Sequence, residues 1–189
     1  MGKIVLTENV TLDGVTQDPT ADEGFNSADW RTDLTAKDRE EWARFILDDT
    51  LAADVLLLGR RTYDFFAGRY PSRTGTFADA VNGLKKYVVS TTLTDPRWTD
   101  TTVLEGLDAV APLKDAVDGE IRVWGSTKLA QGLLERGLVD EVRLLLFPLV
   151  LGKGDQLLNR GTDRPWSLAG VRTVGENLAL LTYGVARSS

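Results

Sequence analysis

Cysteine and histidine are both absent from this 189-residue chain. Their absence excludes disulfides, thiolate nucleophiles, Ser-His-Asp triads and zinc sites built from histidine or cysteine. No metal site is predicted. Any acid–base chemistry must therefore come from Asp, Glu, Tyr or Lys side chains, from water or from a bound cofactor.

Long apolar runs and an excess of positive charge are missing too. No run approaches the roughly 18–20 apolar residues that a membrane-spanning helix requires. The first residues, MGKIVLTENV, lack the apolar segment and cleavage site of a secretory signal. The net charge of −6 argues against a general nucleic-acid or membrane-surface binder. We therefore expect a cytoplasmic protein with a small-molecule partner, and neither nucleic acid nor membrane as a partner.

What the sequence does contain is a regular alternation of apolar runs and amphipathic stretches. Apolar runs predict strands at 3–7, 54–59, 85–91, 101–104 and 120–125. Helical spacing predicts helices over 36–52, 62–68, 76–84, 106–117 and 127–136. Strands dominate after residue 140 and end in a hairpin over 171–184. This order predicts a single α/β domain over 1–189, with a mostly parallel central sheet and antiparallel C-terminal strands.

Three of the predicted strands end in residues that suit a phosphate. The first ends in Gly59-Arg60-Arg61-Thr62, the second in Ser90-Thr91, and the third in Gly125-Ser126-Thr127. Ligands of open α/β sheets bind at the carboxyl ends of the strands. Thr62 and Ser126 are expected to open helices, whose free amides attract anions, and arginine recognises phosphate with two hydrogen bonds.

Each of these segments also has a purely structural interpretation. A Gly-Arg pair after a strand is commonly a turn with solvated cations, and Ser-Thr is a common helix cap. It is the occurrence of all three at equivalent strand ends that favours a nucleotide site. The chain contains neither a Walker A motif nor a complete G-x-G-x-x-G, so a P-loop or simple Rossmann assignment fails.

These segments resemble the dihydrofolate reductase-like fold. They are most similar to the reductase domain of the bifunctional riboflavin-biosynthesis deaminase-reductase and to its stand-alone bacterial branch. The matching stretches follow the family's order: VTLDGVTQDP (10–19), ADVLLLGRRTYDFFAGRYP (53–71), KKYVVSTTL (85–93) and IRVWGSTKLAQGLLERGLVDEVRLLLFPLVLGKGDQLL (121–158). The resemblance implies a dihydrofolate reductase-like three-layer sandwich and bound NADPH.

The resemblance also assigns cofactor-binding positions, one segment at a time. The strand-end segments would hold the adenosine-side phosphates, the adenine with its 2′-phosphate, and the pyrophosphate. Their residues are Gly59, Arg60, Arg61, Thr62, Ser90, Thr91, Trp124, Gly125, Ser126, Thr127, Lys128 and Leu129. The loop beside the nicotinamide would contain Val10, Leu12, Asp13, Gly14 and Val15. Two adjacent arginines agree with an extra phosphate on the ribose, so NADPH is favoured over NADH.

The chain departs from the family at two places. Trp124 stands where the reductases carry the first glycine of a Gly-Gly pair, and its ring is expected to line or partly close the nicotinamide pocket. Dihydrofolate reductases also place a buried carboxylate on the first helix. The candidates for that carboxylate are Asp38, Glu40 and Glu41, none of which lies in an apolar stretch.

The function favoured by these residues is hydride transfer from NADPH to a small heterocyclic, carbonyl or imine substrate. Asp13 is the candidate catalytic residue, against a structural role in an Asp-Gly turn, and the 17–34 loop is a candidate lid. The predicted substrate wall consists of Trp30, Tyr63 and Phe66, against ordinary packing.

Two alternatives to this function stay open. The first is a non-catalytic nucleotide-binding or ligand-sequestering protein on the same fold, because the sequence shows no clear proton donor. The second is reduction of the ribosylamino-pyrimidine of riboflavin synthesis. That substrate carries a phosphate, for which Arg31, Arg69 and Arg73 are the candidate ligands. Similar proteins and the apolar stretch VRLLLFPLVL favour a homodimer.

Overall fold

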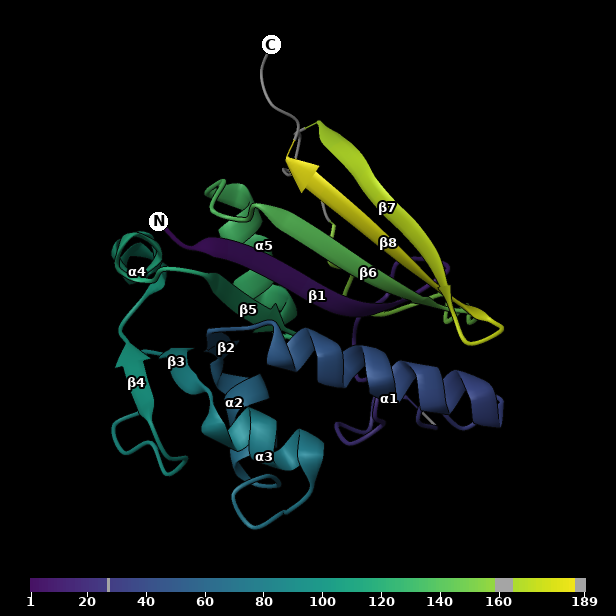
Figure 1. Ribbon diagram of the computed structural model, residues 1–189, viewed down its shortest axis with the longest axis horizontal. Coiled ribbons are helices and arrows are strands. Elements are labelled where there is room, and N and C mark those ends of the chain that lie inside the picture. The colour runs from purple at the N-terminus through teal and green to yellow at the C-terminus, as the bar shows by residue number, and fades with distance from the viewer. Residues whose placement is uncertain (27, 159–164, 186–189) are drawn as a thin grey trace.

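A computed structural model describes residues 1–26, 28–158 and 165–185 of the chain. Eight strands form one sheet in the order β4-β3-β2-β5-β1-β6-β8-β7 (Figure 1). The first six in this order are parallel, whereas β8 and β7 run antiparallel to their neighbours. The strands are β1 (Lys3–Thr11), β2 (Val55–Gly59), β3 (Lys85–Val89), β4 (Thr101–Leu104), β5 (Glu120–Trp124), β6 (Glu141–Phe147), β7 (Trp166–Val174) and β8 (Leu178–Val185).

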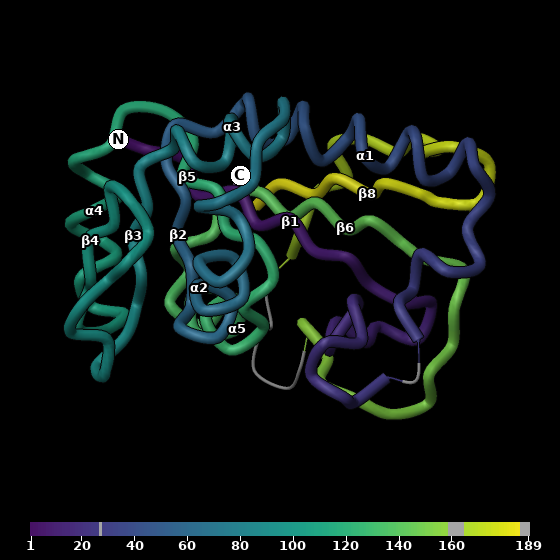
Figure 2. Tube along the Cα trace, turned by 90° about the horizontal axis from the view of Figure 1, so that it is seen from below, coloured from purple at the N-terminus to yellow at the C-terminus, as the bar shows by residue number. Residues whose placement is uncertain are grey.

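Helices cover both faces of this sheet. They are α1 (Ala36–Leu51), α2 (Arg60–Ala67), α3 (Thr76–Gly83), α4 (Val110–Ala116) and α5 (Thr127–Glu135), with a short 3₁₀ turn before α4. Figure 2 shows α1 and α3 on one side of the strands and α5 on the other. The predicted α/β sandwich, with a mostly parallel sheet and antiparallel C-terminal strands, is therefore confirmed.

The central strands are buried because both of their faces meet helices. In β2, Leu57 packs into the core under α4 and α5, whereas Leu56 and Leu58 pack toward α2 and α3. All three leucines are fully buried, which explains the continuous apolar run in the sequence. Where these parallel strands end, they leave one edge open for the site.

Helix α1 begins where the sequence predicts. The Thr35 side chain accepts a hydrogen bond from the Asp38 amide, and the Asp38 carboxylate accepts one from the Thr35 amide. The same carboxylate accepts hydrogen bonds from the amides of Glu176 and Asn177 in the β7–β8 turn. Asp38 therefore joins the start of α1 to the C-terminal hairpin.

Two predicted boundaries at the strand ends are wrong. β1 continues to Thr11 because Glu8 to Thr11 pair with β6. α2 begins at Arg60, so Thr62 lies within its first turn instead of opening it.

Ser126 lies at the start of α5, as the sequence predicts. Ser126 occupies the N-cap position but makes no side-chain capping bond, because its hydroxyl contacts the end of β2.

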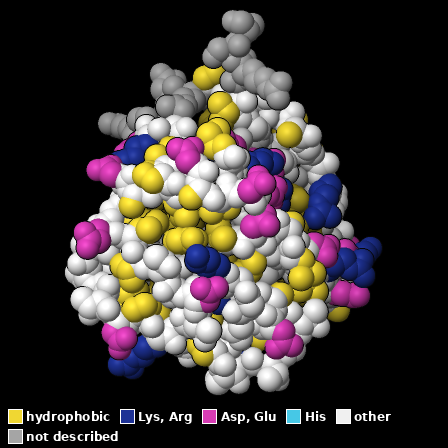
Figure 3. Space-filling model, turned by 60° about the vertical axis from the view of Figure 1, so that its left-hand side comes forward, with side chains coloured by type: hydrophobic (Ala, Val, Ile, Leu, Met, Phe, Trp, Pro, Cys, Tyr) yellow, Lys and Arg dark blue, Asp and Glu magenta, His cyan; other side chains and the backbone are white. Residues whose placement is uncertain are grey.

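No helix within the described residues is long and apolar enough to cross a membrane. On the face drawn in Figure 3, acidic and basic side chains are interspersed around groups of hydrophobic atoms. That face therefore carries no broad field of one charge sign.

Candidate active site at the carboxyl edge of the sheet

A cavity of about 880 Å³ opens at the carboxyl ends of β1, β2 and β5. Its walls come from α1, α2, α5 and the loop between β1 and α1. It brings together twelve of the predicted site residues: Trp30, Gly59, Arg60, Arg61, Thr62, Phe66, Trp124, Gly125, Ser126, Thr127, Lys128 and Leu129. The segments that follow β2 and β5 thus line the same cavity.

The ends of β2 and β5 contact each other directly. The Gly59 amide donates to Ser126 Oγ at 3.0 Å, and Ser126 Oγ in turn donates to Thr62 Oγ1 at 2.7 Å. A Cβ atom added at Gly59 would lie 3.3 Å from both Cβ and Oγ of Ser126. Glycine at this position therefore favours the close approach of β2 to Ser126, and its φ of −79° is one that any residue adopts.

The turn from β5 into α5 has a left-handed backbone at two successive residues. Gly125 has a φ of 53° and Ser126 a φ of 60° with ψ 46°. For a residue with a Cβ, this conformation costs about 1–2 kcal/mol. The hydrogen bonds of Ser126 to the end of β2 offset this cost. They fix the chain that leads into the first turn of α5, with Thr127 and Lys128.

The two predicted phosphate-binding arginines lie at the start of α2, both partly exposed. Arg60 Nε lies 2.8 Å from the Asp64 carboxylate, and Arg60 Nη1 contacts Thr92 Oγ1 at 3.4 Å. Arg61 Nη2 pairs with Glu23 of the loop after β1 at 2.5 Å. Exposed pairs of this kind contribute little stability, so both guanidinium groups can exchange a carboxylate for a phosphate.

Ser90 and Thr91 lie outside the lining of this cavity. Ser90 is buried, and its Oγ accepts hydrogen bonds from the amides of Thr92 and Leu93. It shapes the loop that presents Thr92 to Arg60. The segment after β3 therefore contacts Arg60 through Thr92 but does not line the cavity itself.

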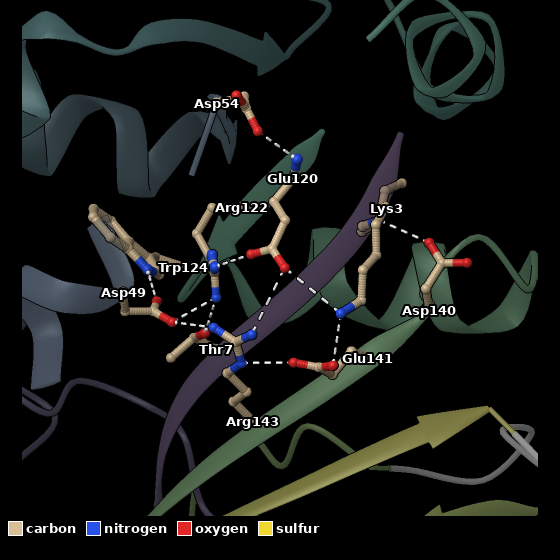
Figure 4. A network of polar contacts seen from close by, with 11 residues as sticks. Lys3, Thr7, Asp49, Asp54, Glu120, Arg122, Trp124, Asp140, Glu141 and Arg143 are labelled. Atoms are coloured by element: carbon tan, nitrogen blue, oxygen red, sulfur yellow. Dashed lines mark hydrogen bonds and ion pairs between the residues drawn. The ribbon is translucent and has the colours of Figure 1, made fainter. Parts of the chain in front are cut away.

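Trp124 lines the cavity and is fixed from behind by a buried ion-pair network (Figure 4). Its Nε1 donates to the Asp49 carboxylate at 2.9 Å. Asp49 also accepts from Arg122 at 2.5 Å and from Arg143 at 2.7 Å, and Asp49 and Arg122 have fully buried side chains. No cis peptide bond occurs in the described part of the chain, including this turn. The Trp124 ring is therefore held in place as part of the cavity wall, at the position where glycine was expected.

Aromatic rings form the rest of that wall. Phe66 stacks on Trp124 at 5.8 Å between ring centroids, and Phe77 stacks on the same indole at 6.2 Å. Trp30 packs edge-on against Phe147 at 5.6 Å. These residues suit a planar ligand.

Two indoles in the cavity have unused hydrogen-bonding capacity. Trp30 Nε1 and Trp42 Nε1 are buried and without a hydrogen-bond partner among the described residues. Both residues line the cavity, so each can donate to an acceptor on a bound ligand.

Tyr63 does not belong to this wall, contrary to the prediction. It is buried against Trp98, and its hydroxyl accepts the Trp98 amide hydrogen at 3.1 Å. The residue follows helical spacing into the core and not toward the cavity. Its role is packing.

The predicted nicotinamide loop also lies outside the lining, with Val10, Leu12, Asp13, Gly14 and Val15. The Asp13 carboxylate accepts hydrogen bonds from Thr11 Oγ1 at 2.6 Å and from the amides of Leu151 and Gly152. These bonds, that of Thr11 above all, hold the pKa of Asp13 below its usual range. The Asp13 carboxylate therefore joins the turn after β1 to the loop after β6 and does not line the cavity.

Glu8 on β1 is the residue that the sequence interpretation missed. It lines the cavity, its side chain and backbone together are 3% exposed, and its Oε1 has no hydrogen-bond partner among the described residues. Burial raises the pKa of Glu8 to about 8. At neutral pH this carboxyl is therefore protonated and can donate a hydrogen bond or a proton.

The three carboxylates proposed on the first helix lie elsewhere. Asp38 is buried in the helix cap, Glu40 is exposed, and Glu41 pairs with Arg44 at 3.3 Å. None of them lines the cavity.

The three arginines considered for a substrate phosphate do line the cavity, but two of them are already paired. Arg31 contacts Asp29, and Arg69 contacts Asp22 at 3.0 Å. Arg73 lies over the Tyr70 ring, 5.3 Å from its centroid. The positive charge at this end is therefore largely neutralised.

Comparisons with known proteins agree with this geometry. Dihydrofolate reductase from Enterococcus faecalis, solved with NADP(H) and RAB-propyl, superposes with a TM-score of 0.67 at 13% identity, covering 98% of each chain. A pyrimidine reductase-like protein from Corynebacterium diphtheriae gives a TM-score of 0.65 at 12% identity, covering 99% of this chain and 93% of its own. At these identities the likeness establishes the fold alone.

Sequence relatives narrow the assignment further. The uncharacterized protein YyaP of Bacillus subtilis is 32% identical over 111 residues, which is 55% of this chain and 58% of that protein. The family described as the RibD C-terminal domain matches residues 2–180. The structural neighbours include a dihydrofolate reductase and a pyrimidine reductase-like protein, and the chain belongs to the RibD C-terminal domain family.

Proposed function

We propose that this protein is an NADPH-dependent reductase that transfers a hydride to a small heterocyclic, carbonyl or imine substrate. One observation carries the proposal: a single cavity joins cationic, hydroxyl-lined strand ends to an aromatic compartment that contains a buried acid. Phosphates suit the first part and a planar reducible group suits the second. Family membership and the reductases among the structural neighbours support the same class of reaction.

The residues present fit a dinucleotide. Arg60 and Arg61 would supply cations for the ribose phosphate, and Lys128 with the first turn of α5 would hold the pyrophosphate. Gly59 adds no Cβ at its close contact with Ser126 between the strand ends. Trp124 and Phe66 form the flat surface beside the reacting group.

NADPH, when bound, supplies the hydride. The protein's own residues hold the substrate against the aromatic wall, exclude water and provide the proton that completes the reduction. The loop after β1 closes over the cavity through the Arg61–Glu23 and Arg69–Asp22 pairs, which makes it a candidate lid.

The non-catalytic alternative was favoured by the lack of a visible proton donor. Glu8 supplies a proton donor at the cavity wall, so catalysis is favoured over nucleotide binding without turnover. Reduction of a phosphate-bearing pyrimidine stays an alternative, because Arg31 and Arg69 are in partly exposed ion pairs of the same kind as those of Arg60 and Arg61.

The proposal is tested by titrating the protein with NADPH and NADH while following tryptophan fluorescence. We expect tighter binding of NADPH, and about a tenfold loss of that preference in Arg60→Ala or Arg61→Ala, as for one lost charged hydrogen bond. Arg44→Ala on α1 is the matched control, since this arginine is equally exposed and lies outside the cavity. Lack of binding of both nucleotides would overturn the proposal.

A further inference from the structure

Glu8 lies in the most buried part of the sheet. β1 is flanked by β5 and β6, and Glu8 follows the Thr7–Trp124 pair and lies opposite Leu144. Ile4 and Leu6, on the same face of the strand, are fully buried in the core under α5. The alternation of the strand therefore carries Glu8 onto an apolar face, at the point where that face reaches the cavity.

No neighbouring charge compensates this carboxyl. The charged residues that share its cavity from the adjoining loops and α5 are Asp18, Asp155 and Lys128, and none makes a hydrogen bond to it. Asp18 is occupied by the amides of Glu23, Phe25 and Asn26. The remaining cavity charges are paired as Arg31–Asp29, Arg69–Asp22, Arg61–Glu23 and Arg60–Asp64, apart from Arg73 over Tyr70.

A buried polar atom without a partner is costly in a folded protein, and a catalytic role is one of the reasons for which such a group is retained. Replacing Glu8 by an apolar residue would remove this cost, yet the cavity wall contains a carboxyl. A ligand in the cavity can supply the missing partner.

We propose that Glu8 is the catalytic proton donor of this cavity. The proposal rests on the reductase function above. The substrate carbon of a C=N or C=O bond gains the hydride, so that the reduced nicotinamide is oxidised. The O–H bond of Glu8 breaks as a new N–H or O–H bond forms on the substrate. The resulting Glu8 carboxylate regains its proton from cavity water.

Two properties suit Glu8 to this role. Burial raises its pKa to about 8, so the acid keeps its proton at neutral pH yet can release it in the reaction. Glu8 follows the last residue of β1 that pairs with β5, so it is level with the start of the β5–α5 turn and lines the same cavity as Trp124 and Phe66.

The first test is the protonation state of Glu8 itself. Difference infrared spectroscopy of the wild type against Glu8→Gln should show a protonated carboxyl at pH 7 that titrates near pH 8. The glutamine keeps the shape of the side chain but cannot release a proton. An ionised Glu8 at pH 7 would overturn the proposal without touching NADPH binding.

The second test is turnover with defined probes, a cyclic imine (methylpyrroline) and dihydrofolate, following NADPH oxidation. We expect Glu8→Gln to bind NADPH as the wild type does and to lose at least about 100-fold in kcat, the usual contribution of a positioned acid. The wild-type rate should fall as pH rises through 8, and this alkaline limb should vanish in residual Glu8→Gln activity. Glu40→Gln, an exposed carboxyl on α1, should retain both.

Each outcome has a clear meaning. Equal rates and equal pH profiles for wild type and Glu8→Gln would overturn the role of Glu8 and leave the reductase standing. A wild type that binds NADPH but reduces neither probe would also count against proton transfer by Glu8. Failure to bind NADPH would remove the reductase proposal, while the infrared band would still report a buried neutral acid.

Discussion

Asp38 and Glu8 are both buried acids, yet their environments move their pKa values in opposite directions. Glu8 has no hydrogen-bond donor beside it, so burial alone raises its pKa. Burial also raises the pKa of Asp38, but hydrogen bonds from Asn177, Glu176 and Thr35 outweigh it and leave the pKa lowered. A carboxyl without donors is suited to keep a proton, and one surrounded by donors is suited to hold structure.

Asp38→Ala is expected to lower the free energy of unfolding by about 2 kcal/mol at pH 7, because amides in the cap and the hairpin turn lose a charged acceptor. The folded pKa of Asp38 lies below its ordinary value of 3.8. Its contribution is therefore complete above that pH and is lost as pH falls below it. Urea unfolding at several pH values measures both effects.

Glu40→Ala provides the control for Asp38→Ala, since Glu40 is exposed on the same helix turn. It should change the free energy of unfolding by less than about 0.5 kcal/mol. Equal losses in the two variants would show that the Asp38 hydrogen bonds contribute nothing specific.

Glu8 also shows where sequence interpretation stops. With the first strand predicted to end at residue 7, Glu8 lay outside it and received no role. The alternation Ile4, Leu6, Glu8, Val10 does contain the signal, because it places an acid on an apolar face. That face is buried only because β1 lies in the middle of the sheet, and strand order is not visible in a single sequence.

Helix α1 is held to the sheet by charge as well as by apolar packing. Its Asp49 lies beside Arg122 of β5 and Arg143 of β6, and it fixes the Trp124 indole. Burial lowers the pKa of Arg122, and the Asp49 carboxylate opposes this shift. The ring position in the cavity therefore depends on Asp49 of α1.

Asp49→Asn is expected to lower the free energy of unfolding by about 3–5 kcal/mol, because it leaves Arg122 as a buried charge without its main partner. The Trp124 ring should loosen at the same time, with a weaker near-ultraviolet circular dichroism signal in the folded protein. Asp48→Asn, at the adjacent exposed position of the helix, should leave both unchanged. A folded Asp49→Asn protein of normal stability would contradict this role for the network.

The sequence predicted whole elements better than it predicted their ends. Apolar runs such as 54–59 and the Thr35–Asp38 cap located β2 and the start of α1, because these signals are local. The position of Ser126 at the start of α5 was predicted, but the bonds of its hydroxyl to Gly59 and Thr62, more than sixty residues away, were not. Contacts of that range depend on the fold, and the assignment of Tyr63 to the substrate wall was wrong for the same reason.

The homodimer stays a prediction, and β7 is the surface best placed to form it. This strand is at one edge of the sheet and exposes Leu168 and Val171, which are 57% and 61% accessible. An unpaired apolar edge strand readily pairs with another chain.

Val171→Lys is expected to convert the dimer to a monomer, because lysine on an edge strand opposes pairing. Light scattering after size-exclusion chromatography measures the mass. Leu51→Lys, at an equally exposed leucine at the end of α1, should leave the dimer intact. A wild type that is monomeric at all concentrations would show that the prediction is wrong.

The order of the strands also has a consequence for the newly made protein. β1 pairs with β5 and β6, so Lys3 must wait for Glu120, and Val5 for Glu141, to leave the ribosome. β2 and β3 lie close in the sequence and can pair much earlier. During synthesis the first apolar segment therefore remains without partners while most of the chain is added, which slows folding and favours chaperone capture. The cavity, with Glu8 on that segment, forms late.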